Sequence, residues 1–248
     1  FGCPTGGKSS VDKNLIQDGL DAGLRIQADC RVQSVLTEGG RAVGLVGRLR
    51  HPDTGEPGAE LVVKARKAVV LAAGSIGTPR LLWLDGLAKK LGPVGDQLFL
   101  HPGTGVLGIC DHEVHMWKGA TQGAYVWTPD EPDVLPHTFN APPEAFLALS
   151  GKVGLDAKKL LTEINHLCGL GVMVHDHGDG SVRADSAGRA KLRYRWHDDD
   201  VATLKRGIVL SARVLLAGGA REVQTTAYGA QRHSTIESLE TELWPMPL

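Results

Sequence analysis

A glycine-containing bend is the first place in this sequence where residue types and spacing could support chemistry. Residues 68–73 form an apolar run without polar alternation, which predicts a strand buried on both faces of a parallel sheet. The run ends in Gly74-Ser75-Ile76-Gly77, and Thr78 is placed to cap a helix with Pro79 in its first turn. Backbone N–H groups at such a helix N-terminus can hold a phosphate or a ribose. An ordinary connection between strand and helix is the alternative interpretation.

A second candidate lies at the start of the chain. The segment Gly2-Cys3-Pro4-Thr5-Gly6-Gly7-Lys8-Ser9 matches the spacing G-x-x-x-x-G-K-[ST] of a phosphate-binding loop. Such a loop normally follows a buried strand, and a single residue precedes it here. Pro4 also lacks an N–H group where such a loop uses its backbone. Nucleoside triphosphate binding is therefore kept as an alternative hypothesis.

The ten histidines include no residue that the sequence assigns as a catalytic base or a metal ligand. His175, His177 and Asp179, with His166, have the residue types of a metal cluster, but the glycine-rich segment 176–180 favours a turn. We therefore predict no metal site, and the catalytic residue stays unassigned. Three histidines in expected loops are predicted to be solvated: His112, His115 and His137.

Composition excludes several classes of protein. The 248 residues are 42% hydrophobic and 22% charged, which is typical of a globular protein with one large or two small domains. The net charge of −1 gives no basic surplus for nucleic acid, and no apolar stretch reaches the roughly 18–20 residues of a membrane span. The four cysteines form no C-x-x-C pair, which fits a reducing, cytoplasmic compartment. Because the chain begins with Phe1 and shows no signal peptide, we expect a fragment, a processed chain or a part of something larger.

Periodicity predicts an α+β fold. Ser10 and Gly23 bound an expected helix over 11–22, and residues 24–64 read as a three-stranded meander that turns at Gly39-Gly40. Asp198–Asp200 begin the clearest helix, which Gly218-Gly219 end, whereas the pattern fades beyond Val223 and assigns no type of structure to the tail 226–248. Further strands and short helices are expected at 103–110, 122–127, 146–149, 157–164, 168–175, 181–184 and 191–196.

Several segments of this sequence, which occur in the same order as in the family, resemble the glucose-methanol-choline (GMC) family of FAD-dependent oxidoreductases. Within that family they resemble the branch of long-chain alcohol oxidases and cholesterol oxidases. The resemblance covers residues 1 to about 225. The more specific motif is Val70 to Leu82, which is similar to the second signature of the family. The other matching segments are Phe1 to Ser10, Arg31 to Val35, Val94 to Leu98 with His101-Pro102, Trp117 to Gly119 with Gln122, and Val174 to Gly188 with Tyr194.

The resemblance implies the domain organisation. Residues 1–100 correspond to part of a Rossmann-like FAD-binding domain that includes the β-meander. Residues 101–200 correspond to a substrate domain built on an antiparallel sheet, and a helix within 201–225 is expected to return to the FAD domain. Residues 226–248 are assigned to neither domain and form a tail.

The resemblance also implies a cofactor, FAD, and a substrate, a hydrophobic alcohol or sterol whose CH–OH group is oxidised by hydride transfer to the flavin. Val32 would contact the adenine, Ala72, Ala73, Gly74 and Thr78 would lie near the adenosine and pyrophosphate, and Cys3, Pro4, Thr5 and Gly6 would run near the flavin. An ordinary strand residue is the alternative for Val32. Trp117, Tyr125, Trp127 and Phe139 could line an apolar pocket, and core packing is the alternative for them.

This sequence departs from the family pattern at several points. Asp85-Gly86 stands where Ser-Gly is usual, and Asp96 stands where Arg is common. The sequence contains neither the first dinucleotide fingerprint nor the segment with the catalytic His, so other polypeptide segments are expected to complete the enzyme, and the chain alone is expected to be inactive. A non-catalytic subunit of a flavoprotein complex is the further alternative.

Overall fold

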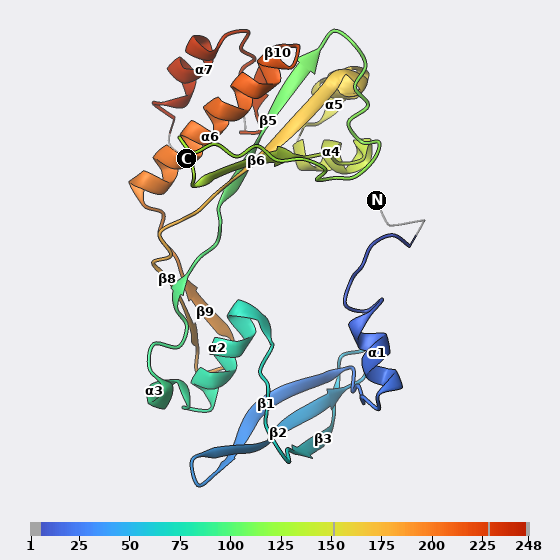
Figure 1. The fold of residues 1–248 in the computed structure, drawn as a ribbon, viewed down its shortest axis with the longest axis vertical. Coiled ribbons are helices and arrows are strands. Elements are labelled where there is room, and N and C mark those ends of the chain that lie inside the picture. The colour runs from blue at the N-terminus through green and yellow to red at the C-terminus, as the bar shows by residue number, and fades with distance from the viewer. Residues whose placement is uncertain (1–5, 151, 228, 247–248) are drawn as a thin grey trace. The chain divides into compact units, whose positions relative to one another are not determined.

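The backbone passes three times between two structural units, at residues 98/99, 178/179 and 195/196. The computed structural model describes residues 6–150, 152–227 and 229–246, except for the side chain of residue 149 (Figure 1). One unit combines 99–178 with 196–248, and the other combines the described residues up to 98 with 179–195. Each unit therefore needs segments that are distant in the sequence.

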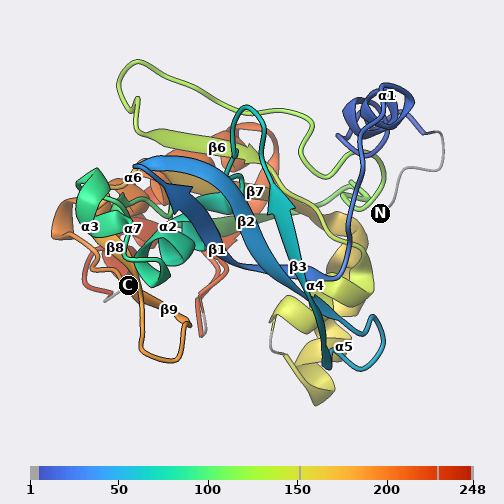
Figure 2. The ribbon, with the colours of Figure 1, turned by 90° about the horizontal axis from the view of Figure 1, so that it is seen from below.

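The three-stranded meander of the second unit forms as the sequence predicts. Strands β1 (Cys30–Glu38), β2 (Arg41–Arg50) and β3 (Pro57–Lys64) pair antiparallel in the order β1-β2-β3, and Figure 2 shows their twist. Gly39 and Gly40 make the first turn with φ values of 54° and 78°, a conformation that glycine adopts without strain. The helix α1 (Leu15–Asp21) precedes the meander and is shorter than predicted, with Asn14 rather than Ser10 at its N-cap.

A second small sheet in this unit packs against helix α2. Strands β4 (Asp96–Leu98), β8 (Gly180–Ala184) and β9 (Ala190–Arg193) pair antiparallel, and α2 (Gly74–Leu84) contacts β8 and β9. The short helix α3 (Ala88–Leu91) follows α2. Two polar contacts fix the packing, because Arg80 Nε donates to the Gly188 carbonyl at 2.7 Å and the Arg183 guanidinium lies 4.8 Å from the Trp83 ring centroid.

The strand predicted at 68–73 is not formed in this structure. These residues have no regular secondary structure and pair with no described strand, and they are half-buried or exposed, with Val70 84% exposed. The prediction rested on apolar character alone, which identifies a buried strand only when neighbouring strands cover it. A parallel Rossmann-like sheet is therefore absent from the described residues.

The other unit is built on a four-stranded antiparallel sheet in the order β10-β5-β7-β6. Its strands are β5 (Gly103–Cys110), β6 (Val134–Thr138), β7 (Leu167–Val174) and β10 (Ala220–Thr225). Side chains alternate between the two faces, so that Val106, Val172 and Val174 point to one face while Leu107, Gly171 and Met173 point to the other. The long helix α6 (Asp198–Ala217) covers the first face.

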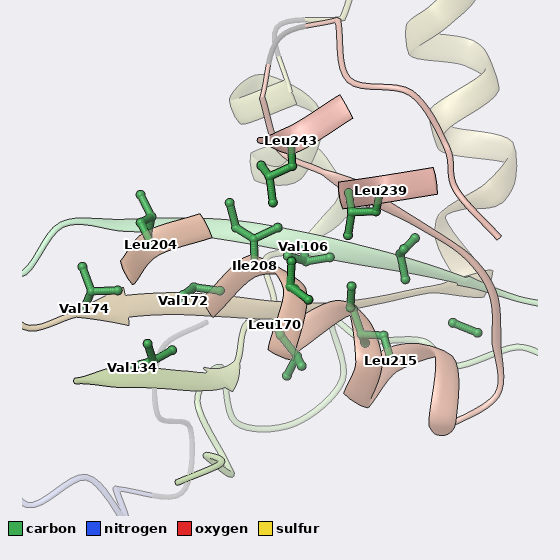
Figure 3. Close-up of a cluster of buried hydrophobic side chains, with 14 of the residues drawn as sticks. Val106, Val134, Leu170, Val172, Val174, Leu204, Ile208, Leu215, Leu239 and Leu243 are labelled. Atoms are coloured by element: carbon green, nitrogen blue, oxygen red, sulfur yellow. The ribbon is translucent and has the colours of Figure 1, made fainter. Parts of the chain in front are cut away.

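Helix α6 and the sheet enclose the main hydrophobic core (Figure 3). The apolar stripe of α6 contributes Leu204, Ile208 and Leu215, which are less than 10% exposed. A last helix, α7 (Ile236–Leu243), adds Leu239 and Leu243, each 1% exposed. Residues 226–248, to which the sequence assigned no type of structure, therefore contribute to the core through α7.

The position of α6 differs from the prediction that this part of the chain returns to the FAD domain. Its buried residues pack on β5, β7 and β10, because the apolar stripe matches the valine- and leucine-rich face of that sheet. The segment 168–196, predicted as one meander, is divided as well, since β7 belongs to the four-stranded sheet and β8 and β9 to the small sheet of the other unit.

Short helices gather at the opposite face of the four-stranded sheet. They are α4 (Pro143–Ser150), α5 (Gly154–Glu163) and the 3-10 helix η1 (Ile164–His166). Phe146, Leu160 and Ile164 from these helices form a second buried cluster with Ile109 and Leu167. The strand predicted at 122–127 is reduced to one bridge, between residues 125 and 137. Within the described part of the chain, no helix is both long and apolar enough to cross a membrane.

Candidate functional site

The bend before α2 is open to solvent. Ala72, Ala73 and Gly74 are exposed, Gly74 has φ +78°, and a Cβ atom added to it would meet nothing within 4 Å. Ala73 occupies the N-cap position of α2 without a side-chain cap, and the first N–H groups of an α-helix have no intrahelical partner. The bend therefore offers small residues, open space and backbone donors to an anionic group such as a diphosphate.

Thr78 has a different role from the predicted one. The helix begins at Gly74, so Thr78 lies inside it rather than at its cap. Its Oγ1 accepts a hydrogen bond from the Ala73 N–H at 3.0 Å. Thr78 therefore holds the bend in shape from the first turns of α2, and the hydroxyl hydrogen is left to donate to another group.

Val32 is half-buried on β1, next to a bulge at Gln33. A hydrogen bond ties this strand to the C-terminal end of α2, because the Val35 N–H donates to Asp85 Oδ2 at 2.7 Å. Burial raises the pKa of Asp85, although the hydrogen bond from Val35 acts in the opposite direction. Asp85 follows the C-terminal end of α2, about 16 Å along the helix from Gly74. This contact does not bring Val32 to the bend.

The predicted site residues at the N-terminus are largely outside the described part of the chain. Cys3, Pro4 and Thr5 lie there, as does the start of the alternative phosphate-binding loop. Gly6 is described; it is exposed and has φ +66°. Its place in a cofactor site stays a prediction.

A cavity of about 770 Å³ lies within the unit that contains the four-stranded sheet. Its floor is the face of β5 and β7 opposite to α6, and its walls come from α4, α5, residue 139 and the segment after β10. Phe139, Phe146 and Leu160 give the walls apolar character, whereas Lys152 and Asp156 are exposed lining residues. A space of this size with mainly apolar walls suits a small apolar molecule.

Glycines make the floor of the cavity flat. Gly103 and Gly105 alternate on β5, and Gly169 and Gly171 alternate on β7, so all four lie on the face opposite to α6. Gly105 and Gly171 are paired directly across the two strands. Three of the four, Gly103, Gly105 and Gly171, line the cavity. A Cβ atom at any of these three would lie 3.0 Å or less from an atom already present, so the floor has no room for side chains there.

Sequence reasoning found this cavity only in part. Of the aromatic residues proposed as a pocket, Phe139 lines it, whereas Trp117 packs beside the second core cluster. Tyr125 and Trp127 are 71% and 60% exposed and do not line it. Phe146 and the glycine floor were missed. The signal for the floor was present as glycine repeated at period two in both strands, which marks one face of a sheet.

Asp176 and Asp200, which lie near His175 and His177, accept hydrogen bonds from backbone N–H groups. Asp176 accepts hydrogen bonds from the N–H groups of residues 100 and 101, at 3.1 and 3.2 Å. His177 Nδ1 lies 2.6 Å from Asp200 Oδ1, and the rings of His177 and His197 are 4.9 Å apart. Among the described residues, no group of three His, Cys, Asp or Glu side chains could hold a metal ion.

Comparison with known proteins gives a consistent result. The family model for GMC oxidoreductase matches residues 1–103. An uncharacterised GMC-type oxidoreductase of Mycobacterium tuberculosis is 35% identical over 98% of this chain and 37% of its own length. A long-chain-alcohol oxidase of Arabidopsis thaliana is 28% identical over 94% of this chain and 32% of its own length.

A shorter match joins this chain to a relative with a more specific name. A 2-methyl-1,2-propanediol dehydrogenase of Mycolicibacterium austroafricanum is 35% identical over 40% of this chain and 18% of its own length. The chain thus spans about a third of the length of the relatives that match nearly all of it.

Proposed function

Because the chain belongs to the GMC oxidoreductase family, we propose that it is part of an FAD-dependent enzyme that oxidises the CH–OH group of an alcohol. The observation that carries the proposal is the match of almost the whole chain to GMC-type relatives, among them one named long-chain-alcohol oxidase. FAD, when bound, supplies the acceptor for the hydride that leaves the alcohol carbon.

In this proposal the bend before α2 binds the adenosine diphosphate end of FAD. Ala72 and Ala73 leave room for the cofactor to touch the main chain, and the N–H groups at the start of α2 donate to a phosphate or ribose oxygen. Thr78 keeps the bend in place through its bond to Ala73. The exposed, uncapped N-terminus of α2 fits this role. We include Val32 and residues 3–6 in the proposed FAD site on the family resemblance alone.

We further propose that the cavity over the glycine floor holds the apolar part of the alcohol. Phe139, Phe146 and Leu160 exclude water from this space, which favours a hydrocarbon chain or ring. The residue that removes the hydroxyl proton is not assigned, and residues outside this chain are proposed to complete the active site.

An absorbance spectrum of the purified full-length protein that contains this chain tests the cofactor. We expect the oxidised flavin bands, and anaerobic addition of decan-1-ol should bleach them. Colourless protein that FAD cannot reconstitute would contradict the proposal.

A pair of variants tests the bend. Ala72→Leu places a side chain in open space where residue 72 is exposed, so it should lower FAD affinity with little effect on stability. Lys67→Leu changes an exposed residue before the bend and serves as the control. Equal FAD affinity in the two variants would remove the bend from the cofactor site.

A further inference from the structure

His137 points into the cavity from the end of a row that crosses the sheet. In this row Gly105 pairs with Gly171, Gly171 pairs with His137, and Thr226 donates its N–H to the Gly105 carbonyl. Paired residues on neighbouring antiparallel strands project to the same face. The row thus carries a polar side chain at each end and two glycines between them.

The two polar side chains lie over the glycines. A Cβ atom built on Gly171 would lie 2.6 Å from Nε2 and 2.8 Å from Cε1 of His137. A Cβ atom built on Gly105 would lie 3.0 Å from Cγ2 of Thr226. The glycines therefore allow the imidazole and the threonine to lie low over the floor while the space above them stays open.

The hydrogen bonding of His137 identifies which nitrogen faces the ligand. Nδ1 lies 3.2 Å from the Leu135 carbonyl oxygen, and because a carbonyl can only accept, Nδ1 carries the hydrogen. The neutral ring then has its lone pair on Nε2, the nitrogen over Gly171. Nε2 has no hydrogen-bond partner among the residues that the structure describes. His137 is also half-buried, which corrects its assignment as a solvated loop residue.

We infer that His137 Nε2 accepts a hydrogen bond from a hydroxyl group of an apolar alcohol that lies over Gly171 and Gly105. The apolar walls bind the hydrocarbon part, and the imidazole discriminates a ligand that can donate a hydrogen bond from one that cannot. This inference deepens the proposed function and rests on it for the class of ligand. It makes His137 a substrate-binding residue that fixes where the hydroxyl lies.

The test compares two ligands of equal size, octan-1-ol, which donates a hydrogen bond, and 1-methoxyheptane, which does not. Binding is measured by calorimetry on the purified protein, with any bound flavin reduced beforehand so that the alcohol is not consumed. We expect the wild type to bind the alcohol about threefold to tenfold more tightly, the ratio that one neutral hydrogen bond gives.

Variants of His137 should change this ratio. His137→Phe should bring it to one, whereas His137→Gln should retain part of it, because an amide oxygen can accept. His112→Phe, at an exposed position outside the cavity lining, is the control and should keep the wild-type ratio. An unchanged ratio in His137→Phe, or no preference in the wild type, would overturn the inference.

A second measurement does not depend on the folding of a variant. The ¹⁵N resonance of His137 Nε2 should move when octan-1-ol is added and stay in place with 1-methoxyheptane. A resonance that responds equally to both ligands would refute the hydrogen bond. Bleaching of oxidised flavin by octan-1-ol is recorded separately, so that failure of the His137 site and failure of the proposed oxidation are distinguished.

Discussion

Replacing Gly207 by alanine tests how closely α6 approaches the four-stranded sheet. Gly207 is a buried residue inside the helix, and a Cβ atom built on it would lie 2.6 Å from Cγ1 of Val172 and 2.8 Å from Cγ1 of Val134. Replacing a glycine inside a helix by alanine normally stabilises it by about 1 kcal/mol. Valine side chains are stiff at χ1, so the added methyl group cannot be accommodated by a simple rotation.

Higher helix propensity and overpacking of the core change the free energy of unfolding of Gly207→Ala in opposite directions. Overpacking of a filled core costs about 1–3 kcal/mol, which equals or exceeds the gain in helix propensity. We expect Gly207→Ala to lower the free energy of unfolding by about 0–2 kcal/mol, the difference between these terms.

Ser211 provides a matched control one turn further along α6. Its side chain is fully buried, and its Oγ has no hydrogen-bond partner among the described residues. Ser211→Ala removes a buried hydroxyl that has no partner and improves helix propensity, so it should stabilise the protein by about 1 kcal/mol.

Amide hydrogen exchange in α6 reports both changes locally. Gly207→Ala should leave exchange unchanged or make it faster, and Ser211→Ala should slow it about fivefold, as 1 kcal/mol requires. If Gly207→Ala slowed exchange by a similar factor, the close contact of α6 with β6 and β7 would be wrong.

Asp85 and Cys168 give two further predictions. Asp85→Ala leaves the Val35 N–H without its acceptor and should cost about 1 kcal/mol, whereas Asp85→Asn keeps an acceptor and should cost less. Burial raises the pKa of Asp85, so its protonated form contributes stability below pH 3.8, and this contribution is lost as the pH rises through the folded-state pKa. Urea unfolding measured at a series of pH values should show this loss in the wild type but not in Asp85→Asn. Burial beneath α6 and the neighbouring Cys110 raise the pKa of Cys168 to about 12, so iodoacetamide at pH 8 should alkylate Cys168 roughly 1,000-fold more slowly in the folded protein than in urea. Similar rates in the two states, measured by mass spectrometry, would contradict the buried environment.

Elements that are apolar on one face and bounded by strong signals could be predicted from the sequence. The strand at 103–110 has the predicted bounds, and α6 begins at the three aspartates and ends at the glycine pair that were proposed as its limits. These elements carry their own caps, turns and periodicity. Helix α7 was missed although Thr235 caps it and Leu239 and Leu243 lie on one side, because short helices derive most of their stability from packing.

Predictions failed where the outcome depends on distant partners. The run at 68–73 is apolar enough for a buried strand, but no described strand covers it. For the candidate site, the bend at 72–74 was located by local pattern, and its role toward FAD stays a proposal. The glycine floor of the cavity was not predicted, because the pairing of Gly105 with Gly171 joins strands that are far apart in the sequence.

The small sheet formed by β4, β8 and β9 has a consequence for synthesis on the ribosome. Helix α2 and β4 emerge early, but the strand that pairs with β4 and packs on α2 begins only at Gly180, after the whole of residues 99–178. Until then α2, whose Leu81 is 4% exposed in the finished protein, lacks its contacts with β8. A nascent chain that ends near residue 103 is therefore a target for chaperones, and expression of that piece alone should give aggregated protein.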